Sequence, residues 1–267
     1  YRFSLEWSKI EPQRGQYNQE AIDHYSDVID ALIEAGITPV LTLHHFTHPL
    51  WFEEMGAFEK SENIVHLVEF SRVVFEAYSD RVKLWCTINE PGVVAVQGYF
   101  TGMFPPGKKS GKFTAEVYKN LLESHVQIYH AIKPMENGDS CQIGIVKNIN
   151  HFDPWRRYHL LDWLFCAALD HVFNNSAIEF FRTGKLKFRV PGLMWLTHSN
   201  PMARNSMDYF GLNYYSHVHI KFSITSDDFS EVKYPEKDKM TDMPYAMYPE
   251  GIYRAINSVS VLNYPII

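Results

Sequence analysis

The residues best suited to chemistry are Asn89 and Glu90, which end an apolar segment just before Pro91. Residues 82–88 are expected to form a strand. Pro91 cannot continue a strand ladder, so the strand should stop at the carboxylate. A carboxyl group at a strand end can act as a general acid, and the neighbouring amide can donate a hydrogen bond to a substrate hydroxyl. The alternative is an ordinary acid that faces solvent.

Three histidines end the preceding predicted strand: His44, His45 and His48. Their spacing raises the hypothesis of a metal-dependent hydrolase. Neighbouring side chains of a strand point to opposite faces, so His44 and His45 do not easily share one site, and no metalloprotease motif is present. We therefore favour a single histidine that donates a hydrogen bond to a polar ligand, with a buried structural histidine as the alternative.

Two further positions carry polar groups on predicted strands. Arg2 lies among apolar residues near the start of the chain, and a buried arginine normally needs a carboxylate partner, for which Glu6 is one candidate. Tyr214 and Tyr215 follow Asn213, and one of two adjacent tyrosines must face the interior of a barrel. A tyrosine hydroxyl there can tune a carboxylate by hydrogen bonding, whereas simple packing is the alternative.

Strands and helices alternate along the chain. Apolar spacing predicts helices over 18–36, 61–80, 113–133, 158–182 and 249–257. It predicts strands near 2–7, 37–44, 82–88, 141–146 and 207–214 and from 264 onward. This order predicts parallel strands with helices outside, as a closed barrel or an open doubly wound sheet. No Gly-rich phosphate turn follows a strand, which favours the barrel. Its site would be built from long loops expected at 92–112 and 216–246.

The composition excludes several classes of protein. The chain has 267 residues, of which 46% are hydrophobic, and a net charge of −6, so it lacks the basic surface of a nucleic-acid binder. No apolar run reaches the roughly 18 residues that a membrane span needs. Three cysteines at wide spacing argue against a disulfide framework and predict a reducing, cytoplasmic location. No linker interrupts residues 1–267, which predicts a single domain. Both ends look cut, since the chain starts without Met and stops within an apolar run.

Five segments, taken together and in order, resemble family 1 glycoside hydrolases, the β-glucosidase and β-galactosidase group. They are Tyr1–Ile10, Leu43–Phe46, Thr87–Pro91, Gly211–Tyr215 and Tyr248–Tyr253. The first resembles the second barrel strand of the family, and Thr87–Pro91 matches its acid/base motif. The resemblance implies an incomplete (β/α)8 TIM barrel. Strands 2 to the start of 7 would be present, and strands 1 and 8 would be missing.

The resemblance also implies roles for individual residues. Glu90 would be the general acid/base, while Asn89 and His45 would bind hydroxyls of the sugar. Phe46 would form an apolar wall at a position where the family often has Trp. Three residues, Arg2, Asn213 and Tyr215, would support or adjoin the nucleophile. The implied substrate is a small β-linked glycoside, and no metal or organic cofactor is implied.

The family nucleophile is a Glu in a Thr-Glu-Asn-Gly stretch, which is expected beyond Ile267. Retention of configuration needs two carboxylates about 5–5.5 Å apart, so the chain as given is expected to be inactive by itself. Two alternatives stay open. One is an inactive sugar-binding fragment or pseudoenzyme, and the other is a 6-phospho-β-glycosidase.

Overall fold

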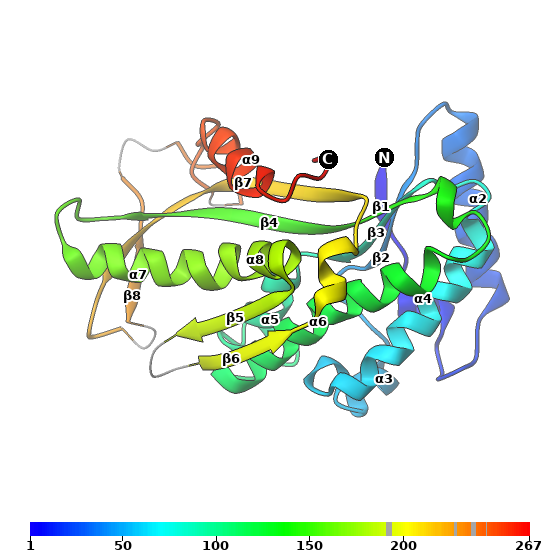
Figure 1. Ribbon diagram of the computed structural model, residues 1–267, viewed down its shortest axis with the longest axis horizontal. Coiled ribbons are helices and arrows are strands. Elements are labelled where there is room, and N and C mark those ends of the chain that lie inside the picture. Colours follow the sequence, from blue (N-terminus) through cyan, green and yellow to red (C-terminus); the bar gives the residue numbers. More distant parts are fainter. Residues whose placement is uncertain (191–193, 227–228, 236–238, 244) are drawn as a thin grey trace.

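The computed structural model describes residues 1–190, 194–226, 229–235, 239–243 and 245–267. Its main sheet has six strands in the order β1-β2-β3-β4-β7-β8 (Figure 1). The strands are β1 (Arg2–Ser4), β2 (Val40–His44), β3 (Leu84–Asn89), β4 (Gln142–Pro154), β7 (Tyr209–Phe222) and β8 (Ser230–Lys233). The strands from β1 to β7 in this order run parallel, as predicted, and β8 is antiparallel to β7.

Helices follow most of these strands. They are α1 (Trp7–Ile10), α2 (Gln19–Glu34), α3 (Leu50–Glu54), α4 (Ile64–Tyr78), α5 (Pro91–Tyr99), α6 (Gly111–Ile132), α7 (Leu160–Asp170), α8 (Ser176–Thr183) and α9 (Gly251–Ser260). The helices predicted over 18–36, 61–80 and 113–133 are confirmed as α2, α4 and α6. Short 3-10 turns occupy Ala57–Glu59, Ser61–Asn63, Gly138–Ser140 and Pro201–Asn205.

Two expectations about loops were wrong. The predicted loop 92–112 begins with helix α5, which Pro91 starts in its first turn and which is too uniformly apolar to show helical periodicity. The predicted helix 158–182, by contrast, is confirmed as one continuous helical stretch made of α7, a π-helix at His171–Asn175 and α8. The predicted loop 216–246 contains the end of β7 and strand β8, while its residues 227–228, 236–238 and 244 lie outside the described residues.

A separate two-stranded sheet was not predicted. It pairs β5 (Lys185–Val190) with β6 (Met194–Ser199) in antiparallel register. The hairpin packs against helices α6 and α8 (Figure 1), and its residues Val190 and Met194 line one pocket with the carboxyl-terminal parts of β4 and β7.

The end of the chain begins another parallel strand beside β7. Phe210 pairs with Ile266 in parallel register, and the Leu212 amide donates to the Ile267 carbonyl at 2.8 Å. The strand predicted from residue 264 is therefore present at its start. Within the described residues the sheet stays open and no closed barrel forms.

A β-bulge in β7 sets which side chains face the site. Ile149 of β4 pairs with Tyr214, but His151 pairs with His217, so three steps along β7 match two steps along β4. A bulge of this kind re-aims the side chains on either side of it. Asn213 and Tyr215, two residues apart, share one face of the sheet, and because of the bulge His217 lies with Tyr214 on the other.

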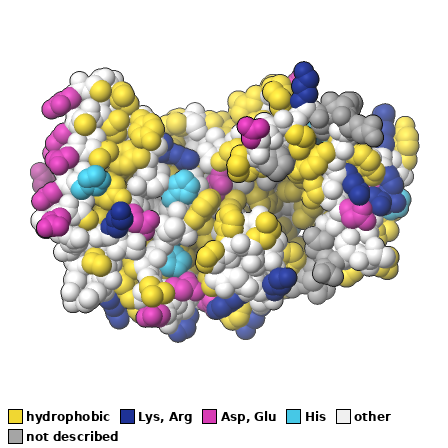
Figure 2. All heavy atoms as spheres, turned by 180° about the vertical axis from the view of Figure 1, so that it is seen from behind, with side chains coloured by type: hydrophobic (Ala, Val, Ile, Leu, Met, Phe, Trp, Pro, Cys, Tyr) yellow, Lys and Arg dark blue, Asp and Glu magenta, His cyan; other side chains and the backbone are white. Residues whose placement is uncertain are grey.

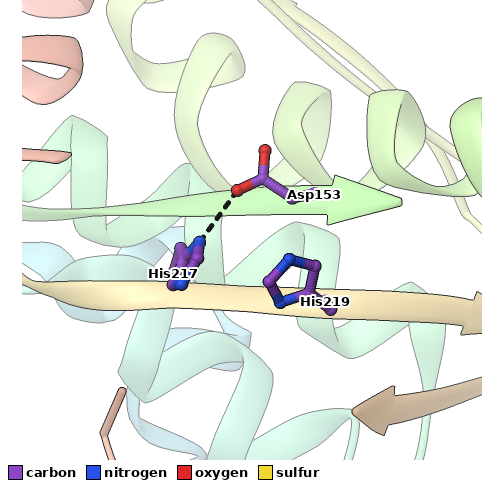
Figure 3. Close-up of side chains that lie close together, drawn as sticks. All are labelled: Asp153, His217 and His219. Atoms are coloured by element: carbon purple, nitrogen blue, oxygen red, sulfur yellow. Dashed lines mark hydrogen bonds and ion pairs between the residues drawn. The ribbon is translucent and has the colours of Figure 1, made fainter. Parts of the chain in front are cut away.

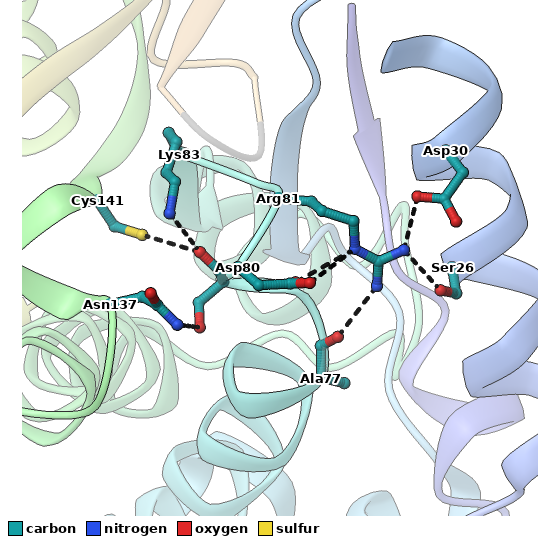
Figure 4. Close-up of polar contacts among 9 residues, drawn as sticks. Ser26, Asp30, Ala77, Asp80, Arg81, Lys83, Asn137 and Cys141 are labelled. Carbon is teal, nitrogen blue, oxygen red and sulfur yellow. Dashed lines mark hydrogen bonds and ion pairs between the residues drawn. The ribbon is translucent and has the colours of Figure 1, made fainter. Parts of the chain in front are cut away.

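Buried side chains fill both sides of the sheet, including Trp85 and Ile88 of β3 beneath helices α4 and α6. The turn before β3 is tied to α2 by Arg81 (Figure 4). Its guanidinium donates to Asp30 at 2.6 Å and to Ser26 at 2.9 Å. This contact fixes the outer helix layer to the start of a strand that reaches the site.

The outer edge of the molecule at α2 is acidic. Its exposed carboxylates are Glu20, Asp23, Asp27 and Glu34, and acidic side chains line the left edge of Figure 2, where α2 lies.

Among the described residues, none of the helices combines the length and hydrophobicity that crossing a membrane requires.

Candidate active site

Glu90 sits at the carboxyl end of β3, on the residue that precedes α5. Its backbone adopts φ 48° and ψ 62°, a left-handed conformation that non-glycine residues rarely take. The Glu90 amide donates to the Val146 carbonyl of β4 at 2.7 Å, which holds this conformation in place. Backbone strain of this kind concentrates at functional sites. The side chain is only 5% exposed, so the carboxylate lies in a protected position.

Two donors from β7 converge on one oxygen of this carboxylate. Asn213 Nδ2 lies 2.5 Å and the Tyr215 hydroxyl 2.9 Å from Glu90 Oε1. Burial and the adjacent Glu90 carboxylate raise the pKa of Tyr215 to about 12, so this hydroxyl keeps its proton and donates near neutral pH. No hydrogen bond to Oε2 occurs among the described residues. Oε2 is therefore the oxygen able to carry a proton to a ligand.

Asn89 lies next to this arrangement. Its side chain is buried, and its Oδ1 accepts from Asn213 Nδ2 at 3.3 Å. Asn213 thus bridges Asn89 and Glu90. The family resemblance set Asn213 and Tyr215 beside a nucleophile, and in the structure both contact the acid itself.

His45 follows β2 and is half-buried. Its Nδ1 lies 2.7 Å from the Ser4 hydroxyl at the end of β1, which orients the ring and leaves Nε2 for a ligand. Burial, and then the positive charge of Arg2, lower the pKa of His45, while Glu90 acts in the opposite sense. His45 is therefore electrically coupled to both Arg2 and Glu90 and is neutral around pH 7.

Phe46 has a left-handed backbone, with φ 71°, directly after His45. Its half-buried ring stands edge-on to His45, with ring centres 4.8 Å apart, and 6.2 Å from the ring of Phe104. These rings give the polar groups an apolar border.

Arg2 is half-buried at the start of β1, on the same side as Cys86 of β3. Burial raises the pKa of the Cys86 thiol to about 11, and the Arg2 guanidinium opposes that rise. In the described part of the chain no carboxylate forms an ion pair with Arg2. Glu6, the partner considered from the sequence, instead accepts hydrogen bonds from Ser8 and Thr47.

Lys147 is a site neighbour that sequence reasoning missed. It is 1% exposed on β4, and its ammonium group donates to the backbone carbonyls of Asn148, at 3.0 Å, and of Phe173 in the π-helix. Burial lowers its pKa to about 7, against the opposing charges of Glu90 and Asp170. The strand predicted over 141–146 stops one residue short of it, and the signal in the sequence is a lysine that directly continues an apolar strand.

The three histidines of the metal hypothesis are not brought together. His45 Nδ1 is paired with Ser4, and His48 Nε2 lies 2.9 Å from Glu53. His44 is buried against Phe58, and burial holds its pKa well below the usual range. Among the described residues, the grouping with three convergent metal-ligand atoms is a different one, Asp153 with His217 and His219.

The parallel α/β sheet, with an acid held at the carboxyl end of one strand and polar groups at the ends of its neighbours, is the arrangement of a barrel-type hydrolase. The model of glycosyl hydrolase family 1 matches residues 1–265, and the chain belongs to this family. Solved structures that resemble it are family 1 enzymes with TIM-barrel folds.

Individual relatives are β-glycosidases. The chain is 32% identical to beta-glucosidase A of Thermotoga maritima over 97% of its own length and 59% of that protein. It superposes on a beta-glycosidase from Pyrococcus horikoshii with a TM-score of 0.85 and 33% identity, covering 100% of this chain and 60% of that one. A 6-phospho-beta-galactosidase of Clostridium acetobutylicum is 32% identical over 82% of this chain and 49% of that protein. The chain thus spans about three fifths of the length of the first two proteins.

Proposed function

We propose that the full-length protein hydrolyses terminal β-linked glycosides, in the manner of a β-glucosidase, by a retaining double displacement with Glu90 as acid/base. The observation that carries the proposal is the buried Glu90 carboxyl group, whose Oε1 accepts from Asn213 and Tyr215 while Oε2 has no bond among the described residues. Family membership over residues 1–265 supports the reaction class.

In the first step, Glu90 gives its proton to the oxygen of the leaving group as the bond from that oxygen to the anomeric carbon breaks. A second carboxylate attacks the anomeric carbon and forms a glycosyl-enzyme ester. Glu90, now a carboxylate, then takes a proton from water, and the hydroxide attacks the same carbon and releases the second carboxylate. Two inversions give net retention.

The second carboxylate is proposed to come from a residue beyond Ile267. The described residues bring no other carboxylate into hydrogen-bond contact with Asn213, Tyr215 or His45. A retaining pair stands about 5–5.5 Å apart, so Glu90 by itself cannot form the intermediate. We accordingly propose that the polypeptide 1–267 alone is inactive, and that the missing part of the barrel comprises strands 1 and 8 and the rest of strand 7.

His45, Asn89 and Phe46 are proposed to bind the sugar. His45 Nε2 would hydrogen-bond a hydroxyl, since Ser4 already engages Nδ1. Phe46 would cover an apolar face of the ring, and Arg2 would stabilise the second carboxylate by its charge. None of these roles calls for a cofactor.

The test compares the full-length protein with its Glu90→Gln variant on two aryl β-glucosides, one with a good and one with a poor leaving group. General acid catalysis contributes about 10²–10⁴-fold, so the variant should lose that much on the poor leaving group and far less on the good one. Glu54→Gln, at an exposed carboxylate of α3, is the matched control and should leave both rates unchanged. Equal activity of Glu90→Gln and the parent would contradict the proposal.

Assays of the same full-length protein distinguish two alternative functions. The Clostridium acetobutylicum relative favours including a 6-phosphorylated aryl β-galactoside, and faster hydrolysis of that substrate than of the glucoside would assign a 6-phospho-β-glycosidase. A pseudoenzyme would bind glucose without hydrolysing any of these substrates.

A cytoplasmic location is also proposed, supported by three buried cysteines that form no disulfide.

A further inference from the structure

A second group of polar side chains lies on the other face of the sheet, past the β7 bulge. His217 and His219 are two residues apart on β7, and Asp153 of β4 pairs directly with His219 (Figure 3). Residues two apart on a strand share a face. The bulge turns this face away from Asn213 and Tyr215, so the group is separate from the candidate active site.

The three side chains point toward one another. One potential ligand atom from each lies within 4.8 Å of the others, and His217 Nδ1 is 3.0 Å from Asp153 Oδ2. Zinc bonds of about 2.0–2.2 Å in a tetrahedral site separate neighbouring ligand atoms by about 3.3 Å. Binding an ion would therefore bring the ligand atoms from within 4.8 Å to about 3.3 Å of one another by movement of the side chains, on two strands whose backbones are paired.

We propose that Asp153, His217 and His219 form a binding site for a divalent transition metal ion such as Zn²⁺. Two imidazoles and one carboxylate are ligands that suit zinc and its neighbours rather than magnesium or calcium, which prefer oxygen. The ion would replace the proton shared between His217 and Asp153 and would clamp β4 to β7 beyond the bulge. The site is independent of the glycosidase proposal.

Surrounding rings hold the two histidines in position. His217 stacks on Tyr248 with ring centres 4.1 Å apart, and His219 lies 6.1 Å from Trp155 in an edge contact. Such outer contacts orient metal-binding imidazoles.

Arg254 of α9 opposes the ion. Its two terminal nitrogens each lie 3.1 Å from an oxygen of Asp153, so its positive charge competes for the same carboxylate. Each carboxylate oxygen has two lone pairs, which leaves Oδ2 able to accept both Arg254 and a metal. This competition makes a specific prediction: removing Arg254 should tighten metal binding.

The test uses full-length protein freed of metal by a chelator. Titration calorimetry measures Zn²⁺ binding, and the visible absorption of Co²⁺ reports nitrogen and oxygen ligands. We expect one equivalent to bind, at least tenfold weaker in Asp153→Asn and in His219→Gln, and at least threefold tighter in Arg254→Met. His24→Gln, at an exposed histidine of α2, should bind like the parent.

Circular dichroism establishes that each variant is folded. If His219→Gln does not fold, Asp153→Asn still tests the site, because asparagine has nearly the size of aspartate. The proposal is overturned if no Zn²⁺ binds. It is also overturned if Asp153→Asn and His24→Gln bind Zn²⁺ with the same affinity, because the ion would then be held by histidines scattered over the surface. Unchanged affinity in Arg254→Met would also contradict the site, because the guanidinium would then not share its carboxylate.

Discussion

Replacing Lys147 by Met should remove a large pH dependence from the stability of the protein. The Lys147 ammonium is buried and interacts electrostatically with Glu90, and burial lowers its pKa from 10.5 to about 7. The unfolded chain therefore binds one more proton than the folded chain between these pH values. In that window the free energy of unfolding rises with pH, and the contribution is lost as the pH falls toward 7.

The magnitude follows from the two pKa values. Between pH 7.5 and 9.5 this one group should add about 2.5 kcal/mol to the free energy of unfolding. Lys147→Met also leaves the carbonyls of Asn148 and Phe173 without their donor, at a cost of about 1–3 kcal/mol each. That cost is the same at every pH, so the difference between the two pH profiles isolates the lysine.

Urea unfolding followed by tryptophan fluorescence, at several pH values, measures both profiles. The difference cancels other groups that titrate in this range, such as Cys86, whose pKa burial raises to about 11. Carbon-13 labelling of lysine gives a direct check, since one Cε resonance should titrate near pH 7 and vanish in the variant. Parallel profiles of the two proteins, or a Lys147 resonance that titrates above pH 10, would show that Lys147 is not the source of the pH dependence.

Three further outcomes are expected. Tyr215→Phe removes a hydrogen-bond donor to the Glu90 carboxylate. Because hydrogen bonds to charged groups contribute about 1.5–3 kcal/mol, kcat/KM for an aryl β-glucoside should fall about 10- to 100-fold. An unchanged kcat/KM would exclude a role for that hydrogen bond. Ser4→Ala frees the His45 ring and should raise KM about fivefold with little effect on kcat, from the loss of about 1 kcal/mol of orienting energy; a fall in kcat alone would contradict it. Arg81→Met severs a part-exposed link between α2 and β3 and should lower Tm by about 2–4 °C, for about 1 kcal/mol after screening by solvent; a Tm equal to that of the parent would show that the link adds no stability.

The sequence predicted the parallel core of the fold because each of those strands is a short apolar run between periodic helices. Strands β2 and β3 lie within one to three residues of their predicted limits. The extensions of β4 and β7 were missed because residues 147–154 and 215–222 are rich in His, Asn and Lys and do not look like buried strands. Long-range pairing of the two strands, rather than local preference, makes them extended.

Other elements left a usable signal. Leu186, Phe188 and Val190 alternate with Lys and Arg along β5, which is the pattern of a half-buried strand. The π-helix at 171–175 has no such signature, since a single wide turn does not change the hydrophobic period of the flanking helices.

The sequence predicted which residues form the candidate site better than it predicted the hydrogen bonds between them. Asn89 ends β3 and Glu90 follows it, while His45 and Phe46 follow β2, so their positions could be inferred from the fold. Asn213 and Tyr215 are two apart on β7 and so share a face, but their contact with Oε1 of Glu90 joins β7 to the end of β3 and cannot be read from one strand. The β7 bulge, after which His217 lies on the opposite face, is likewise a property of two strands together.

The most direct test of the central claim is azide rescue of Glu90→Ala in the full-length protein with an activated aryl β-glucoside. Once the acid/base is removed, water attacks the glycosyl-enzyme slowly, whereas azide needs no general base. Azide should restore turnover, and proton NMR should identify the product as the β-glucosyl azide. An α-configured azide would contradict retention. A variant that keeps full activity without azide would show that Glu90 is not the acid/base.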